Sequence, residues 1–226
     1  MYKSVKAVKN ITRQERNISM SYYKYLKEEI AWIKEHDPSL NSAVEIWFMP
    51  GFRALKTWYF THKLYKKHPS LARIISLRSQ RKTGIDIHPG ATIGKHVFID
   101  HGSGVVIGET CVIGERVMIY QGVTLGATGK VAGKRHPTVE DDVVIGAGSK
   151  IIGNITLHQG CKIGAGSVII KDVPANTTMI PAPAYAIRNQ NGKIKVPNIS
   201  SLEGKLNCVL KQLDPDNSKC KKEADS

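Results

Sequence analysis

The sequence has few cysteines and no long apolar segment. Its 226 residues include four cysteines, and none of them forms a C-x-x-C pair. This argues against a disulfide scaffold and against a zinc ribbon. No apolar run is long enough to span a membrane or to act as a signal sequence, so we expect a cytoplasmic protein without a membrane segment.

Acidic residues are scarce relative to basic ones. The chain has 19 Asp and Glu against 33 Lys and Arg, a formal net charge of +14. The excess is concentrated in the flanks, at residues 3–16, 63–82 and 193–222. No recognition-helix, zinc-finger or aromatic ribonucleoprotein pattern accompanies this charge, so we expect no nucleic-acid partner. Solubility, or attraction to a phosphorylated small ligand, explains it better.

An aliphatic residue returns at every sixth position through the middle of the chain. The positions are Ile87, Ile93, Ile99, Ile107, Ile113, Ile119, Leu125, Val139, Ile145, Ile151, Leu157, Ile163 and Ile169. A small or β-branched residue precedes most of them by two positions, as at Ala91, Cys111 and Cys161. Hexapeptide repeats of this kind predict a left-handed parallel β-helix, a three-sided prism with eighteen residues per coil. A β-sandwich would show period two instead.

Helical patterns precede the repeats. Apolar residues from Tyr23 to Ile33 recur at helical spacing and stop before Pro38, and further helices are expected over Ala43–Met49, from Phe52 to Lys66 and after Pro69. We therefore expect an N-terminal helical domain that caps the first coil.

The chain after the repeats carries weaker signals. Asn191 and Gly192 indicate a turn, and apolar residues between Leu202 and Leu213 recur at helical spacing. The predicted organisation is a helical domain at 1–82, the β-helix at 83–188, and a tail with a short helix at 189–226.

Two interruptions of the repeat are candidate functional segments, because regular coils only pack. Two extra residues follow Ile99, within the segment Asp100–Gly104. The second interruption is the loop from Gly126 to Pro137, whose glycines suit close approach to a ligand. It is cationic through Lys130, Lys134, Arg135 and His136. The alternative for this loop is a solvated surface excursion without function.

His101 lies in the first interruption, fifteen residues after Asp86. That spacing puts the two residues on successive coils near one corner, where a carboxylate could orient the imidazole for general-base catalysis. A zinc site using His96, His101 and His136 is the alternative. We expect no metal, since the order of the spacings reverses that of carbonic-anhydrase-like prisms.

The combined motifs resemble serine O-acetyltransferases. They are DIHPGATIG (86–94), DHGSGVVIGET (100–110), QGVTLGATGK (121–130), KRHPTVEDD (134–142), IGAGSKIIGNI (145–155) and KIGAGSVIIKDVP (162–174). The repeats alone would indicate only an acyltransferase-type fold, whereas DIHP, DH and GKRHP together indicate this family. The resemblance implies acetylation of the L-serine hydroxyl by acetyl-coenzyme A (acetyl-CoA).

The resemblance also implies a role for individual residues. His101 would take the hydroxyl proton and Asp86 would orient it, while Asp37 and Asp100 would hold the serine ammonium group. Arg135, with His136 beside it, would bind the serine carboxylate, which suits a bidentate guanidinium. The set that would line the acetyl-CoA cleft between neighbouring prisms is Gly126, Ala147, Ala165 and, near the phosphates, Lys162.

Two departures from the family pattern leave the acceptor open. Ala127 and Pro181 stand where glycines are usual. Homoserine, another small amino acid or a sugar therefore remain alternative acceptors, since one methylene changes discrimination by only ~1–3 kcal/mol. A basic binding protein with an inactive prism is a further alternative, which only the charge favours.

The resemblance implies partners as well. The short helical segment is typical of homotrimers, and free cysteine is expected to act as a feedback inhibitor. Many members dock cysteine synthase through a C-terminal isoleucine. Because this sequence ends in Ser226 behind two acidic residues, we expect no tight complex of that kind.

Overall fold

The computed structural model describes residues 22–37, 40–129, 132–182, 188–189 and 192–193. The chain divides into two compact units, Met1–Pro181 and Ala182–Ser226. In the second unit, β15 (Arg188–Asn189) pairs antiparallel with β16 (Gly192–Lys193). The helix expected between Leu202 and Leu213 lies outside the described residues, and the predicted domain boundaries stay predictions.

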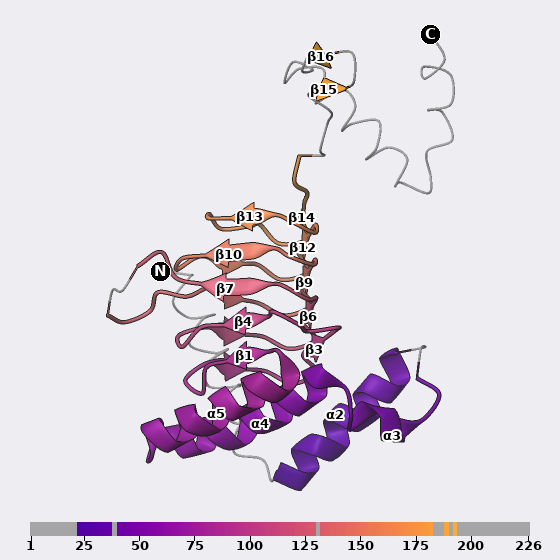
Figure 1. Ribbon diagram of the computed structural model, residues 1–226, viewed down its shortest axis with the longest axis vertical. Helices are drawn as coiled ribbons and strands as arrows, with labels where there is room; N and C mark the ends of the chain where they lie inside the picture. Colours follow the sequence, from indigo (N-terminus) through magenta and orange to yellow (C-terminus); the bar gives the residue numbers. More distant parts are fainter. Residues whose placement is uncertain (1–21, 38–39, 130–131, 183–187, 190–191, 194–226) are drawn as a thin grey trace. The chain divides into compact units, whose positions relative to one another are not determined.

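Short parallel strands form a three-sided prism, which fills most of the first unit (Figure 1). Sheet A contains β1 (Asp86–Ile87), β4 (Val106–Ile107), β7 (Thr124–Gly126), β10 (Lys150–Ile152) and β13 (Val168–Ile169). Sheet B contains β2 (Thr92–Ile93), β5 (Val112–Ile113), β8 (Thr138–Val139) and β11 (Thr156–Leu157). Sheet C contains β3 (Phe98–Ile99), β6 (Met118–Ile119), β9 (Val144–Ile145), β12 (Lys162–Ile163) and β14 (Thr178–Met179). From β1 to β10 each strand pairs in parallel with the third strand after it, and the last pair of sheet C is β12 with β14. This confirms the predicted left-handed parallel β-helix.

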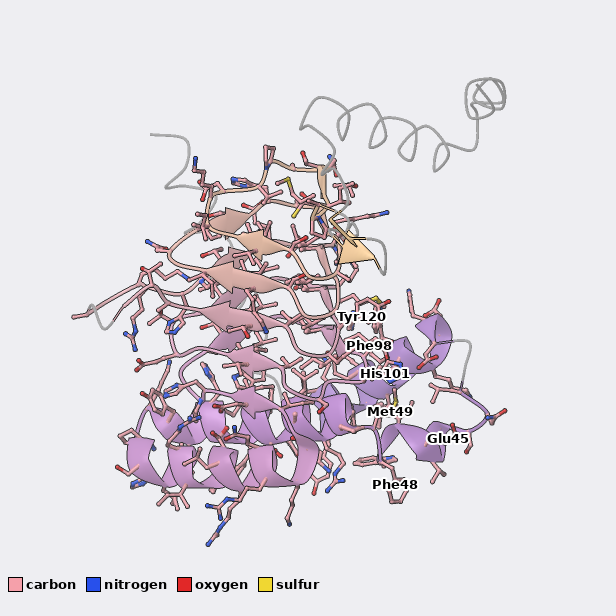
Figure 2. All side chains as sticks on the ribbon, turned by 45° about the horizontal axis from the view of Figure 1, so that its top comes forward. Glu45, Phe48, Met49, Phe98, His101 and Tyr120 are labelled. Atoms are coloured by element: carbon pink, nitrogen blue, oxygen red, sulfur yellow. The ribbon has the colours of Figure 1, made fainter. Side chains whose placement is uncertain are left out.

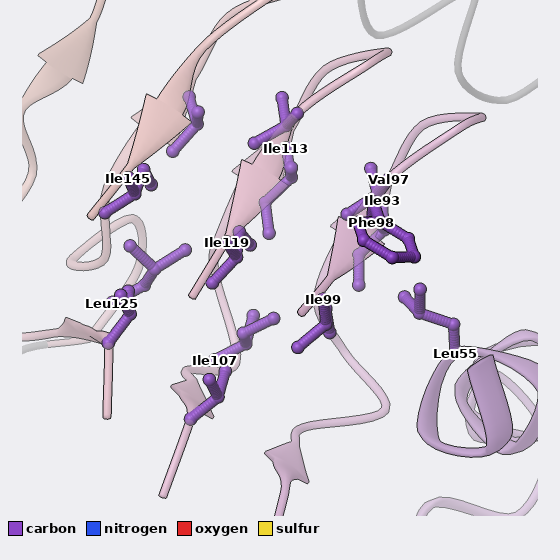
Figure 3. Packing of buried hydrophobic residues seen from close by; sticks show 14 of the residues in the cluster. Leu55, Ile93, Val97, Phe98, Ile99, Ile107, Ile113, Ile119, Leu125 and Ile145 are labelled. Atoms are coloured by element: carbon purple, nitrogen blue, oxygen red, sulfur yellow. The ribbon is translucent and has the colours of Figure 1, made fainter. Parts of the chain in front are cut away.

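The predicted register of inward residues is confirmed. All thirteen aliphatic positions are buried, and none exposes more than 6% of its surface. Ile99, Ile119 and Ile145 stack coil upon coil, beside Ile107 and Leu125 (Figure 3). The stack buries a continuous apolar core. Each Å² of apolar surface that it removes from water stabilises the fold by about 25 cal/mol.

Cys111 and Cys161 are buried in the same core, as the sequence predicted, and neither is in a disulfide. Burial raises the pKa of Cys111 to about 12 and that of Cys161 to about 11, so both are inert thiols. Cys208 and Cys220 lie outside the described residues.

Repeat glycines allow successive coils to approach each other. A Cβ at Gly94 would lie 2.5 Å from the Gly114 carbonyl oxygen, and one at Gly146 would lie 2.6 Å from the Ala165 nitrogen. The φ angles of Gly94 and Gly146 are not in the left-handed region. Glycine is therefore needed at these positions because there is no space for a Cβ, and not because of the backbone conformation.

The helices lie against the first coil (Figure 1). They are α2 (Tyr22–His36), α3 (Ala43–Ile46), α4 (Pro50–Tyr65) and α5 (Pro69–Thr83). Both α4 and α5 begin with proline at the first helical position, and Gly84, with φ 73°, caps the C-terminal end of α5. None of the described helices is long and apolar enough to cross a membrane.

The four predicted helices are confirmed, with small differences at their ends. Helix α4 begins at Pro50 and ends at Tyr65, whereas the prediction was Phe52 to Lys66. Helix α3 ends at Ile46 rather than Met49. Met49 precedes Pro50 and adopts an extended ψ of 124°, because the proline ring disfavours a helical residue before it. Ser42 accepts a hydrogen bond from the Val44 amide and caps the start of α3.

Candidate active site on two edges of the prism

The predicted site residues lie where the chain passes between sheets. The CA edge joins sheet C to sheet A at residues 100–105, 120–123, 146–149 and 164–167, and the AB edge joins sheet A to sheet B at residues 88–91, 108–111, 127–137 and 153–155. Each face of the prism is roughly 15–20 Å wide, the length of five or six extended residues.

His101 projects from the CA edge directly after β3. The insertion closes a tight turn, in which the Gly102 amide donates to the Asp100 carbonyl and the Ser103 amide donates to the His101 carbonyl, both at 2.7 Å. The imidazole is 77% exposed, and its Nε2 lies 3.8 Å from Asp100 Oδ1. Figure 2 shows His101 near Phe98, with Tyr120 one coil further along.

The backbone of His101 is in the left-handed region, with φ 57°. At the CA edge, the other described residues with positive φ are the glycines 102, 104, 122, 148 and 166. A non-glycine residue in such a conformation costs of order 1 kcal/mol. Elsewhere in the described chain His96, Arg116, Asp142 and Asn176 also adopt it, so His101 is distinguished by its place at the repeat break and not by the conformation alone. The insertion therefore aims this imidazole away from the prism at an energetic cost.

Asp86 begins β1 and is held by a helix. Arg73 of α5 donates from Nη1 to Asp86 Oδ1 at 2.9 Å and from Nη2 to Oδ2 at 3.4 Å. Within the described residues Asp86 makes no hydrogen bond to His101. Asp37 follows the end of α2 and is half-buried.

Arg135 lies at the AB edge, on the final part of the loop. Its guanidinium donates from Nη2 to the Glu109 carboxylate, and Tyr65 of α4 donates to the other oxygen of that carboxylate at 3.1 Å. The hydrogen bond from Arg135 lowers the pKa of Glu109 below its ordinary value. Helix α4 thus helps to hold the arginine through Glu109.

His136 follows Arg135 and is 8% exposed. Its ring packs so closely on Gly108 that a Cβ there would lie 2.0 Å from Cδ2. The Thr110 amide donates to Nδ1 at 3.2 Å, so the neutral ring carries its proton on Nε2. Burial, reinforced by the charge of Arg135, lowers the pKa of His136, so the neutral form dominates at pH 7.

Lys134 closes the base of the loop. Its ammonium donates to the carbonyl oxygens of Thr110 and His136, both at 2.7 Å, and of Pro137 at 3.0 Å. Burial lowers the pKa of this ammonium to about 8. The charges of Lys134 and Arg135 are therefore both paired within the chain, Lys134 with backbone carbonyls and Arg135 with Glu109.

The four residues predicted to line the acetyl-CoA cleft also divide between edges. Ala147 and Ala165 lie on successive coils of the CA edge, where the Gly166 amide donates to the Ala147 carbonyl at 2.8 Å. Lys162 begins the adjacent strand β12 and is exposed. Gly126 ends β7, next to the AB edge.

Within one chain, the imidazole of His101 and the guanidinium of Arg135 therefore belong to different edges, separated by the width of sheet A. The histidines of the alternative zinc site are further divided, because His96 lies at a third edge, between sheets B and C. Among the described residues, no group of three or more His, Cys, Asp or Glu side chains is close enough to hold a metal ion.

Sequence reasoning missed the residues that support these side chains. Arg73, Tyr65, Glu109 and Thr110 contact Asp86, Arg135 or His136 as described above. Glu109 and Thr110 stand in the quoted motif DHGSGVVIGET, one coil below the loop. Their place in that motif could have indicated that they support the loop. Arg73 and Tyr65 lie on helices, whose docking no repeat predicts.

Known proteins resemble this chain closely. Residues 136–171 match the family model described as bacterial transferase hexapeptide (six repeats), and residues 104–132 match hexapeptide repeat of succinyl-transferase. A serine acetyltransferase from Bacillus pumilus is 51% identical over 174 residues, which cover 76% of this chain and 80% of the relative.

Solved structures agree. The serine acetyltransferase of Neisseria gonorrhoeae in complex with serine has a TM-score of 0.67 at 38% identity, covering 73% of this chain and 68% of that one. The Entamoeba histolytica isoform 3 in complex with cysteine has a TM-score of 0.70 at 37% identity, covering 82% and 65%. The Brucella abortus enzyme in complex with coenzyme A has a TM-score of 0.68 at 39% identity, covering 78% and 70%. With half of the aligned residues identical over 76% of this chain and 80% of the Bacillus pumilus relative, this chain belongs to the serine acetyltransferase family.

Proposed function

We propose that the chain catalyses acetyl-CoA-dependent O-acetylation of L-serine by direct attack, with His101 as the general base. The serine hydroxyl oxygen attacks the thioester carbonyl carbon, the new C–O bond forms and the C–S bond breaks. His101 takes the hydroxyl proton and returns it to the departing coenzyme A sulfur, so no acyl-enzyme is needed. The exposed imidazole on a strained turn at a repeat break is the observation that carries this proposal.

Asp86 is the proposed orienting partner of His101. A carboxylate on the second ring nitrogen would fix the tautomer and stabilise the imidazolium that forms. Because Arg73 binds both carboxylate oxygens, this role requires Asp86 to share or release that pair. Asp86→Asn should therefore reduce turnover less than removal of the imidazole.

The amino-acid substrate would be held at both ends. Arg135 and the Nε2–H of His136 suit its carboxylate, and Asp37 and Asp100 suit its ammonium group. Support comes from His136, whose buried Nε2–H has no acceptor within the described residues. An unpaired buried donor costs about 1–3 kcal/mol, which a bound carboxylate would offset.

A homotrimer would complete the site. The CA edge of one subunit, with His101, Ala147 and Ala165, would face the AB edge of the next, with Arg135 and His136. Lys162 and Gly126 lie on the strands adjacent to these edges. Acetyl-CoA would then lie in the cleft between two prisms. Within one chain these two groups are separated by a face roughly 15–20 Å wide, which is too far for one serine molecule to touch both. This separation supports the proposed trimer.

Mixing two impaired variants tests the arrangement, provided that activity is measured at a serine concentration far below the raised KM of Arg135→Ala. His101→Ala and Arg135→Ala subunits, unfolded and refolded together in equal amounts, should recover about a quarter of wild-type activity, because each mixed ring contains one intact site in three. Each variant refolded alone is the control. Absence of recovery, with mixed rings demonstrated by tags on both subunits, would mean that both residues serve the same subunit's site.

Cysteine is the proposed inhibitor of this site. It shares the ammonium and carboxylate groups of serine, and it is present in the E. histolytica complex. We expect it to compete with serine rather than with acetyl-CoA. Calorimetry that detects no cysteine binding to the free enzyme would contradict this.

A further inference from the structure

Thr110 contacts three consecutive residues at the end of the loop, Lys134, Arg135 and His136. Its hydroxyl accepts hydrogen bonds from the amides of Arg135 and His136, both at 3.1 Å. The same hydroxyl lies 2.9 Å from His136 Nδ1, and the Thr110 carbonyl accepts from the Lys134 ammonium at 2.7 Å. One half-buried side chain on the coil below therefore holds the segment that carries the proposed carboxylate-binding pair.

The direction of each hydrogen bond of the Thr110 hydroxyl follows from its number of donor and acceptor positions. A hydroxyl has one donor and two acceptor positions, and two amide donors occupy the acceptor positions of Thr110. Its own proton is thus left for His136 Nδ1. Because the Thr110 amide also donates to Nδ1, that nitrogen is an acceptor and the ring proton resides on Nε2.

We infer that Thr110 is a positioning residue for substrate binding, which fixes the tautomer of His136 and seats Arg135 through their backbone amides. With the proton on Nε2, His136 presents a donor to an anionic group. The opposite tautomer would present a lone pair there and repel a carboxylate. Affinity for the amino acid, and for any inhibitor with the same carboxylate, then depends on a hydroxyl that touches neither ligand. The consequence for affinity rests on the proposed function, but the tautomer does not.

Thr110→Val is the informative variant, since valine has the same shape and β-branching but no hydroxyl. It leaves two amides without their acceptor and removes one donor to Nδ1. Thr110→Ser is the matched control, because it keeps the hydroxyl. If the hydroxyl acts as inferred, the valine variant should raise KM for serine about tenfold, or ~1.4 kcal/mol. KM for acetyl-CoA should stay within about twofold of wild type, and the serine variant should behave like wild type for both substrates.

A direct measurement of the ring separates the inference from the proposed function. In ¹⁵N-histidine NMR at pH 8, wild type and Thr110→Ser should show His136 with an unprotonated Nδ1, and Thr110→Val should show a measurable share of the Nδ1–H form. Thermal unfolding and gel filtration of each variant establish that it is folded and assembled like the wild type.

The outcomes are distinct. Unchanged His136 signals in Thr110→Val would overturn the inference, as would a serine variant impaired as much as the valine variant. Unchanged KM for serine in Thr110→Val, when Arg135→Ala raises it, would overturn the role in substrate binding. Altered signals with an unchanged KM for serine in both Thr110→Val and Arg135→Ala would leave Thr110 as the residue that sets the tautomer and would refute the proposed carboxylate site instead.

Discussion

Glu29 is a buried carboxyl group whose titration should make the docking of α2 dependent on pH. It is 3% exposed, and both carboxylate oxygens accept from the His96 amide, at 2.9 and 3.2 Å. Burial raises its pKa from 4.5 to about 7, and the His96 amide and the nearby charge of Lys95 oppose this only in part. Helix α2 ends next to Asp37, so its docking also bears on the proposed ammonium site.

Proton linkage decides whether the folded state gains or loses stability as the pH rises. The folded protein binds this proton more tightly than the unfolded chain does, so the stabilisation is fully present below pH 4.5. It is lost as the pH rises to about 7. At 1.36 kcal/mol per pH unit, the total is roughly 3 kcal/mol. The buried His62 and the half-buried His88, whose pKa values are lowered by desolvation, contribute to stability with the opposite sign below pH 6.5.

The assay is urea unfolding of wild type and Glu29→Gln at several pH values from 5 to 8. The other titrating groups cancel in the difference between the two free energies of unfolding. That difference should fall by roughly 2–3 kcal/mol between pH 5 and pH 8. Glu28→Gln is the control, because it removes a carboxylate from the same helix at a more exposed position, where Glu28 pairs with Lys95. A flat difference for Glu29→Gln over the same range would refute the reasoning.

Three further predictions concern the site. His101→Ala should lower kcat by about 100-fold or more, measured as thiol release from acetyl-CoA, and full activity would remove it from the mechanism. Arg135→Ala should raise KM for serine far more than KM for acetyl-CoA, whereas equal effects would indicate a general lid. Gly108→Ala should displace the His136 ring, since the new Cβ would lie 2.0 Å from it, and raise KM for serine.

The repeat was predictable because its cause is local. An inward aliphatic at every sixth position is required by the pitch of the coil itself, and all thirteen positions are buried as expected. His101 and Arg135 were detectable for the complementary reason, since both stand where the period breaks. The helices were predictable from their own spacing and from Pro50 and Pro69, but their boundaries shifted by a few residues where proline acted on its neighbour.

Contacts between the helices and the prism were not predictable in this way. The pairs Arg73–Asp86 and Tyr65–Glu109 depend on how α4 and α5 dock on the prism. Neither the six-residue repeat nor the helical spacing of apolar residues determines that docking. Glu29 did leave a signal, because it stands with Leu26 and Ile33 on the apolar stripe of α2. A carboxyl group on such a stripe needs a polar partner, and the sequence could not show that this partner is a backbone amide of the prism.

The coil architecture explains why the site residues occupy the edges. Strand pairing survives both interruptions, since β1 pairs with β4 across the two-residue insertion, and β5 pairs in register with β8 although the whole loop lies between them. Extra residues at a corner therefore cost no ladder hydrogen bonds, whereas an insertion within a strand would turn inward residues outward. A rigid prism can thus carry strained or mobile chain only at its edges. Because consecutive edges are a face apart, groups on two of them act on one small substrate only if a second subunit brings them together. On this argument, the separation of His101 from Arg135 is itself a reason to expect that a single chain is inactive.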